Sequence, residues 1–249
     1  MAVRGTSVKR REDGPLLRGE GTFVADIKFD NPAYVHYLTS TMAHATVLSI
    51  ETSAARSMPG VIDIVTNADL DIGPYPSANP LFDEAMIRPL LADKRVRFVG
   101  EPIVAIVADS PSIAADAAEL IEIDYDSLDA VVDVEAALES EVLLFEGTAE
   151  GNVVCRMGAE GLDADFGSCE VVTEVRTINN RLAPAPIETR VAAAEWTGDG
   201  RLHCFNAGQG PHPVRAIIAS ILEIEKEQIR VVSRDVGGSF GAKARPSPE

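Results

Sequence analysis

Cysteine is scarce in this sequence, and its placement excludes several classes of site. The 249 residues contain three cysteines, Cys155, Cys169 and Cys204, and no two of them form a CxxC pair. An odd number of dispersed cysteines supports neither a disulfide framework nor a zinc or iron–sulfur site. We therefore expect three reduced thiols, which commonly pack as small hydrophobic side chains.

The sequence also contains fewer positively than negatively charged residues. Lysine and arginine number 22 against 39 aspartates and glutamates, which gives a formal net charge of -17. Nonspecific affinity for nucleic acid depends on clustered cations that displace counterions from the phosphate backbone. The composition therefore argues against a nucleic-acid partner.

Long apolar runs are missing as well. The basic start, Met1 to Gly14, is not followed by the apolar stretch of a signal peptide, and no later stretch approaches the length that spans a bilayer. We expect a cytoplasmic protein without a membrane span. With 46% hydrophobic and 24% charged residues, the chain can form a packed core in one large or two modest domains.

The first half of the chain shows a repeated strand–helix–strand pattern. The helix of the second repeat has a strong start signal, because Ser110 is a good N-cap and Pro111 suits the first helical turn. The pattern predicts an α+β domain that ends near residue 135. The expected strands are 47–50, 61–66, 102–108 and 121–125, and the expected helices are 53–58 and 112–119.

Residues 136–165 are rich in acids and glycine and predict an extended linker, so that the expected domains are 1–135 and 166–249. Strands are expected again at 169–177, 191–196, 202–206 and 229–232. Before the last strand, Pro213 is expected to open an amphipathic helix. Its apolar residues follow helical spacing: Val214, Ile217, Ile218, Ile221 and Leu222.

A glycine-rich loop follows the last expected strand. Gly237, Gly238 and Gly241 lie within five residues, in the sequence Gly-Gly-Ser-Phe-Gly-Ala-Lys. Glycine costs conformational entropy unless the backbone needs positive φ or a close approach. Such a loop exposes N–H groups that suit an anion or an oxo group, although a tight turn explains the glycines equally well. The residues beside Lys243 do not fit a nucleotide P-loop, and the spacing does not fit a dinucleotide fingerprint.

A second loop precedes the amphipathic helix. Gln209 lies between Gly208 and Gly210, where its amide can both donate and accept hydrogen bonds. His212 lies next to Pro213 and is at least as suited to capping the helix as to binding a metal, because no second ligand is nearby in the sequence. Gln209 alone would be a surface amide. Gln209 becomes a candidate site residue because the two loops lie at the ends of elements that are expected to pack side by side.

These loops, in this order, resemble the large subunits of the molybdenum hydroxylase family, which includes xanthine dehydrogenase, aldehyde oxidase and carbon monoxide dehydrogenase. The resemblance extends along nearly the whole chain. Its other segments are Leu16 to Asp26, Ser40 to Ala45, Val96 to Ala108, and Ala183 to Trp196, in which Ile187 stands where the family usually has methionine.

The resemblance implies an α+β fold in which an a/b hammerhead domain is followed by the first, incomplete segment of the molybdenum cofactor-binding domain. It implies that Gln209 hydrogen-bonds an oxygen on molybdenum, with Gly210 in the same loop. It also implies that Gly237, Gly238, Phe240 and Gly241 lie against the molybdenum and the pterin dithiolene, with Phe240 beside the metal. No residue of this chain is expected to bind the metal directly.

The family's catalytic base is a glutamate that lies far beyond the residues matched here, so no catalytic residue is expected in this chain. Glu188 is close to the site in the family pattern, but we expect a structural role for it beside Arg190. The resemblance implies a molybdenum–molybdopterin cytosine dinucleotide cofactor that is shared with a chain carrying the remainder of the large subunit. It also implies partner subunits that carry iron–sulfur clusters and FAD.

Two functions are consistent with this sequence. The first is a molybdenum-dependent oxidoreductase, active only within a multi-subunit complex, in which this chain forms one wall of the cofactor site. Its substrate would be an aldehyde, an N-heterocycle or a molecule like carbon monoxide, hydroxylated with oxygen from water. The alternative is a noncatalytic interaction or scaffold protein that retains the hammerhead domain. The intact glycine loop favours the enzyme, because a scaffold has no need of costly backbone freedom there.

Overall fold

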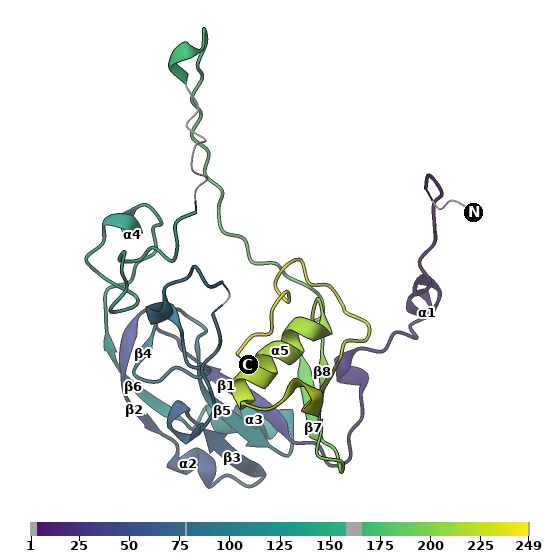
Figure 1. Ribbon diagram of the computed structural model, residues 1–249. Helices are drawn as coiled ribbons and strands as arrows, with labels where there is room; N and C mark the ends of the chain where they lie inside the picture. Colours follow the sequence, from purple (N-terminus) through teal and green to yellow (C-terminus); the bar gives the residue numbers. More distant parts are fainter. Residues whose placement is uncertain (1–3, 78, 158–165, 249) are drawn as a thin grey trace. The chain divides into compact units, whose positions relative to one another are not determined.

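The computed structural model describes residues 4–77, 79–157 and 166–248, and the chain divides into two compact units. The first unit is formed by residues 33–183 together with Pro248. The second unit joins the N-terminal segment, up to residue 32, to residues 184–247. Both units combine helices with sheets, so the expected α+β class is confirmed (Figure 1). The domain limits expected at residues 135 and 165 stay a prediction.

In the described part of the first unit, the strands form two three-stranded antiparallel sheets. The sheet orders are β1-β5-β3 and β4-β2-β6. The elements in chain order are β1 (Tyr34–Thr39), β2 (Ala45–Glu51), α2 (Ser53–Arg56), β3 (Val61–Val65), η2 (Asn67–Asp69), η3 (Glu84–Met86), β4 (Arg95–Val96), β5 (Pro102–Ala108), α3 (Pro111–Ala118), β6 (Glu122–Ser127), α4 (Ala136–Glu139) and η4 (Phe166–Ser168).

The two strand–helix–strand repeats expected from the sequence are present, but each repeat distributes its strands between the two sheets. In the first repeat, β2 and β3 belong to different sheets, and in the second the same holds for β5 and β6. The strands then pair across the repeats, β2 with β6 and β3 with β5. The two repeats therefore close on each other, and neither can form a sheet by itself.

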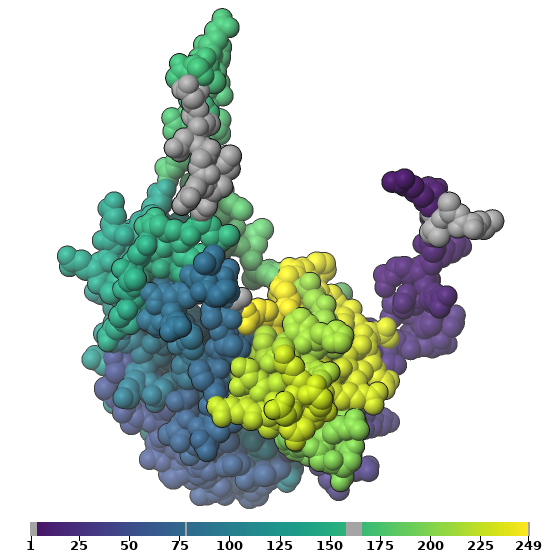
Figure 2. Space-filling model, in the orientation of Figure 1, coloured from purple at the N-terminus to yellow at the C-terminus, as the bar shows by residue number. Residues whose placement is uncertain are grey.

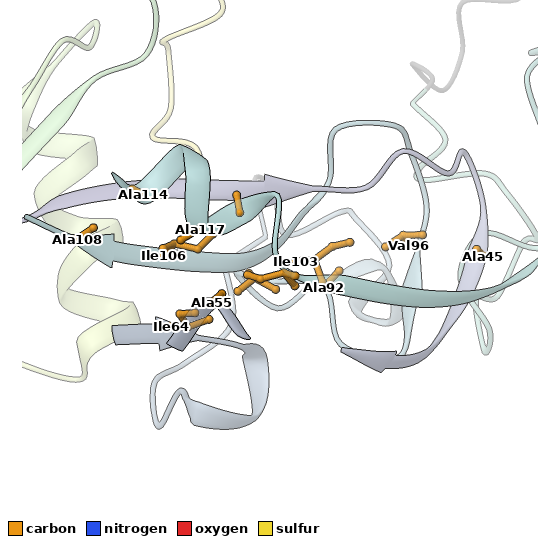
Figure 3. Close-up of a cluster of buried hydrophobic side chains, with 13 residues drawn as sticks. Ala45, Ala55, Ile64, Ala92, Val96, Ile103, Ile106, Ala108, Ala114 and Ala117 are labelled. Carbon is orange, nitrogen blue, oxygen red and sulfur yellow. The ribbon is translucent and has the colours of Figure 1, made fainter. Parts of the chain in front are cut away.

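The core of this unit centres on β5, whose continuous apolar sequence is buried on both sides. Ile103, Val104 and Ile106 are fully buried. Helix α3 presents Ala114 and Ala117 toward this strand, and such small side chains allow the helix backbone to approach closely (Figure 3). Ser110 caps α3 as expected, by accepting a hydrogen bond from the amide of Ile113.

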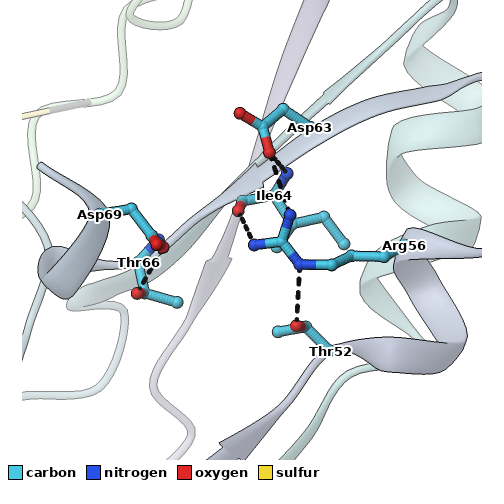
Figure 4. Close-up of polar contacts among 6 residues, drawn as sticks. All are labelled: Thr52, Arg56, Asp63, Ile64, Thr66 and Asp69. Carbon is cyan, nitrogen blue, oxygen red and sulfur yellow. Dashed lines mark hydrogen bonds and ion pairs between the residues drawn. The ribbon is translucent and has the colours of Figure 1, made fainter.

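Arg56 ties the short helix α2 to β3. Its guanidinium donates hydrogen bonds to the hydroxyl of Thr52 at 3.3 Å, to the carboxylate of Asp63 at 3.1 Å and to the carbonyl of Ile64 (Figure 4). A helix of one turn has little stability of its own. These side-chain contacts therefore fix a helix that its own backbone hydrogen bonds cannot maintain.

The second unit contains a small mixed sheet of order β7-β8-β9. β8 pairs antiparallel with β7 and parallel with β9, and helix α5 makes the crossover between β8 and β9. Leu202, Cys204, Ala219 and Ile229 form the core between the sheet and the helix. The elements are α1 (Asp13–Leu17), η1 (Val24–Asp26), β7 (Ala192–Trp196), β8 (Leu202–Asn206), α5 (Pro211–Leu222), η5 (Lys226–Gln228) and β9 (Ile229–Val232).

Two sequence predictions were wrong. Helix α5 begins at Pro211 and not at Pro213, because the amides of the first helical turn need no acceptor and both prolines are tolerated there. The strand expected at residues 169–177 is extended but forms no sheet, and it can be followed in green in Figure 2. Its apolar side chains are exposed, including Val171, Val172 and Val175. In the described residues, no helix is both long and apolar enough to cross a membrane.

Candidate functional site

The glycine loop leaves the end of β9 and is anchored at its start. The carboxylate of Asp235 accepts a hydrogen bond from the amide of Thr22 at 2.7 Å, and the amide of Asp235 donates to the Thr22 carbonyl at 3.2 Å. These reciprocal bonds join the loop to the N-terminal segment, which also packs Phe29 edge-on against Phe205. The position of the loop is therefore set before its glycines begin.

The three glycines of the loop meet different requirements. Gly238 and Gly241 have φ of +100° and +90°, in the left-handed region that favours glycine. Gly237 is needed for close approach, because a Cβ built on it would lie 2.5 Å from the Cβ of Glu188. Phe240 also adopts positive φ, at 50°, and its side chain is 76% exposed. A non-glycine residue in this conformation is unusual and costs free energy.

The loop is partly a turn and partly an array of unbonded donors. Two turn bonds close its second half, from the amide of Ala242 to the Ser239 carbonyl at 2.9 Å and from the amide of Ala244 to the Gly241 carbonyl at 3.3 Å. The four consecutive amides of residues 238–241 donate to no acceptor in the described part of the chain. These four N–H groups are available to water or to a ligand. They make the loop a potential binding surface for an anion.

Gln209 lies directly beside this loop. Its backbone amide donates to the carbonyl of Lys243 at 3.0 Å, and its side-chain oxygen accepts a hydrogen bond from the hydroxyl of Ser239. The same hydroxyl accepts a hydrogen bond from the amide of Lys243 at 3.2 Å. The expected pairing of the two loops is confirmed. Because the Gln209 oxygen is used, its amide NH₂ is the part left to meet a ligand.

Glu188 contacts the glycine loop, which agrees with the structural role expected for it, although the ion pair that it forms is with Lys243. Its Oε2 atom accepts a hydrogen bond from the amide of Gly237 at 2.8 Å and forms an ion pair with the ammonium group of Lys243 at 3.0 Å. The side chains are 13% and 3% exposed, so the pair is almost out of contact with water. The sequence offered two signals for this pair: a single carboxylate in a proline-rich segment, and a lysine at the end of a glycine loop.

Gly210 and His212 lie at the start of α5. Gly210 is the N-cap residue and has extended backbone, so its conformation does not require glycine. His212 is exposed and lines a shallow cavity of about 260 Å³ together with Arg201, Arg215 and Arg230, away from the glycine loop residues. In the part of the chain that is described, no three His, Cys, Asp or Glu side chains form a cluster that could bind a metal.

The three cysteines form no disulfide and differ in burial. Cys204 is buried in β8, and burial raises the pKa of its thiol to about 11. At neutral pH this residue is a protonated hydrophobic side chain, since the thiolate is the form that binds metals and reacts. Cys169 is exposed and Cys155 is half-buried. Cys204 therefore contributes to the packing between the sheet and helix α5.

Comparison with known proteins assigns both halves of the chain. Residues 18–129 match the family "Aldehyde oxidase and xanthine dehydrogenase, a/b hammerhead domain", and residues 145–249 match the "Molybdopterin cofactor-binding domain". The nicotine 6-hydroxylase large subunit of Paenarthrobacter nicotinovorans is 37% identical over 99% of this chain. The carbon monoxide dehydrogenase large chain of Afipia carboxidovorans is 31% identical over 96% of it. In both cases the chain spans only 31% of the relative's length.

A solved structure gives the same result. Quinoline 2-oxidoreductase from Pseudomonas putida 86 superimposes on 98% of this chain with a TM-score of 0.88 and 38% sequence identity, and 32% of its own chain is covered. The hammerhead match, the cofactor-domain match and the relatives agree on one assignment. The chain belongs to the molybdenum hydroxylase family of xanthine dehydrogenase and aldehyde oxidase, and it corresponds to the N-terminal part of the family's molybdopterin-binding large subunit.

Proposed function

We propose that this chain forms one wall of the molybdopterin site of a molybdenum-dependent oxidoreductase that hydroxylates its substrate. The observation that carries the proposal is the row of unbonded amides at residues 238–241, with the Gln209 side chain beside it. Both lie in the part of the chain that matches the molybdopterin cofactor-binding domain. A noncatalytic scaffold, the alternative function, has no structural feature in its favour.

The residues present fit the chemistry of this cofactor. Unbonded backbone N–H groups and a free amide NH₂ are donors, and the oxygen atoms of an oxo group or a phosphate are acceptors. The open space around Gly241, where an added Cβ would meet no atom within 4 Å, leaves room for a ligand against the backbone. When bound, the molybdenum cofactor supplies the oxidation–reduction chemistry.

The chain's own residues would bind and orient the cofactor. In this proposal Gln209 donates from its Nε2 atom, Gly210 lets the loop pass close to the ligand, and Gly238 and Gly241 present their amides. Phe240 covers the site with its exposed ring. Preorganised donors stabilise developing charge because they need no reorientation during the reaction.

The finer assignment concerns cofactor form, partners and substrate. We propose a molybdopterin cytosine dinucleotide, with the site completed by the remainder of the large subunit and with electrons passed to iron–sulfur and FAD subunits. The matched relatives support a larger assembly, since the chain spans 31% of their length. Among an aldehyde, a molecule like carbon monoxide and an N-heterocycle, the names of the nicotine and quinoline enzymes favour the last.

Affinity purification of this chain from its native host tests the proposal. We expect it to copurify with a larger partner or to form part of a longer polypeptide, and the assembly should contain about one molybdenum per site by elemental analysis. The 249 residues expressed alone should retain none. Stoichiometric molybdenum in the isolated chain, or none in the native assembly, would contradict the shared site.

A further inference from the structure

The buried ion pair between Glu188 and Lys243 closes the glycine loop at both of its ends. One atom, Oε2 of Glu188, accepts from the amide of Gly237 at 2.8 Å and contacts the ammonium group of Lys243 at 3.0 Å. The return bond, from the amide of Glu188 to the Gly237 carbonyl, measures 3.2 Å. A single carboxylate thus fixes the first residue of the loop and the last.

Stability alone is a poor explanation for this pair. Removing two charges from water offsets much of their attraction, so a buried ion pair often contributes no more than apolar side chains of similar size. The other oxygen of Glu188, Oε1, is buried and has no hydrogen-bond partner in the described chain, which adds a further cost. The pair is more readily explained by the geometry that it imposes.

Hydrogen bonds connect Lys243, one member of the ion pair, to Gln209. The amide of Lys243 donates to the hydroxyl of Ser239, and its carbonyl accepts from the amide of Gln209 at 3.0 Å. Ser239 in turn holds the side-chain oxygen of Gln209. A shift of Lys243 therefore moves both the backbone and the side chain of Gln209, although Glu188 has no hydrogen bond to Gln209.

We propose that Glu188 and Lys243 are positioning residues, which hold the glycine loop and the Gln209 loop in one arrangement so that their donors face a common ligand. The coupling between the loops follows from the contacts above. The identity of the ligand rests on the proposed function. Neither residue is assigned a contact with the cofactor.

The coupling can be measured in the 249-residue chain by residue-resolved amide hydrogen exchange. Glu188→Gln keeps an acceptor for the Gly237 amide but removes the charge that holds Lys243. We expect exchange of the Gln209 amide to rise at least tenfold, with the amide of Ile229 in the sheet unchanged. Glu195→Gln, at an exposed position on β7, is the matched control and should change neither amide.

Two outcomes would overturn the coupling. If the Gln209 amide is unaffected in Glu188→Gln, the ion pair does not position the second loop. If the amides of Gln209 and Ile229 rise together, Glu188 only stabilises the unit.

Lys243→Met separates positioning from folding, because it leaves the buried Glu188 carboxylate without its counter-charge. We expect it to destabilise the unit more than Glu188→Gln does. The double variant should recover global stability, since both buried side chains are then neutral, while Gln209 exchange stays at least tenfold above wild type. Recovery of both quantities would assign the pair a structural role only.

In the native assembly, Glu188→Gln should lower kcat at least tenfold with KM little changed, and it should alter the electron paramagnetic resonance spectrum of the bound molybdenum. A merely structural role predicts less loaded enzyme with an unchanged spectrum. The two proposals fail separately. An unchanged molybdenum spectrum refutes the positioning role, whereas a wild-type assembly without molybdenum refutes the proposed function.

Discussion

Gly237→Ala tests the close packing between the glycine loop and Glu188. The new Cβ would lie 2.5 Å from the Cβ of Glu188, about 0.9 Å inside ordinary van der Waals contact at 3.4 Å. Separation by that distance would also break the bonds of 2.8 and 3.2 Å that join the two residues. Overpacking of this kind costs about 1–3 kcal/mol, and a lost bond to a charged group costs about 1.5–3 kcal/mol more. We expect a loss of about 2.5–6 kcal/mol in the free energy of unfolding.

The prediction becomes specific in a double-mutant cycle with Glu188→Gly. Without a Cβ at position 188, the nearest remaining contacts of the alanine are the backbone nitrogen and Cα of residue 188, at 3.4 and 3.5 Å. The φ of Gly237 is not in the left-handed region, so alanine meets no backbone strain there. In that background the same substitution should therefore cost nothing, or stabilise by about 0.4–1 kcal/mol through the unfolded chain.

Urea unfolding followed by tryptophan fluorescence measures both quantities. The sequence has one tryptophan, Trp196, which lies in β7 of the same unit. The coupling energy should be about 2 kcal/mol or more, above the roughly 0.5 kcal/mol expected for independent sites. An equal cost of Gly237→Ala in both backgrounds would refute the packing argument.

Three further predictions concern other parts of the chain. Gln209→Ala in the native assembly should lower turnover about 10²-fold, by analogy with the loss of one oxyanion donor; Gln228→Ala is the control, and equal effects would remove Gln209 from the site. Burial raises the pKa of the Cys204 thiol to about 11, so alkylation at pH 8 should label Cys169 quickly and Cys204 only after unfolding. Mass spectrometry can check the order of labelling, and rapid labelling of both residues would contradict the burial of Cys204. Residues 171–178 should gain amide protection in the native assembly, and exchange as fast as in the isolated chain would show that nothing pairs with them.

Local patterns predicted most of the fold. The strands at 102–108, 202–206 and 229–232 have the expected bounds, because their apolar sequences are continuous and end at clear turn residues. The exchange of strands between the two sheets could not be predicted, since pairing depends on contacts that are distant in the sequence. β1 was missed for a related reason. Its residues, 34–39, become a strand by pairing with β5, whereas residues 169–177, which also contain valine and threonine, pair with no strand in the described part of the chain.

The site shows where motif reasoning stops. Gln209 and the glycine loop were predicted from the resemblance, and the expectation that they are neighbours followed from the elements that they end. Glu188 was expected to have a structural role because it lies in a segment of the resemblance that is read as structural, and the sequence did not predict its contacts with the glycine loop. Its role depends on a contact with Gly237 across 49 residues of sequence, which only the folded chain reveals.

The glycines themselves do not share one purpose, and this changes what the motif means. The amide of Gly237 is already bonded to Glu188, and its missing side chain makes room for that residue. Gly241 has open space beside it and an unbonded amide. The first glycine is therefore required by the protein's own packing, and the later positions are the ones free to meet a ligand. A substitution at Gly237 would impair the site by moving the loop, and one at Gly241 by altering the surface that the loop presents.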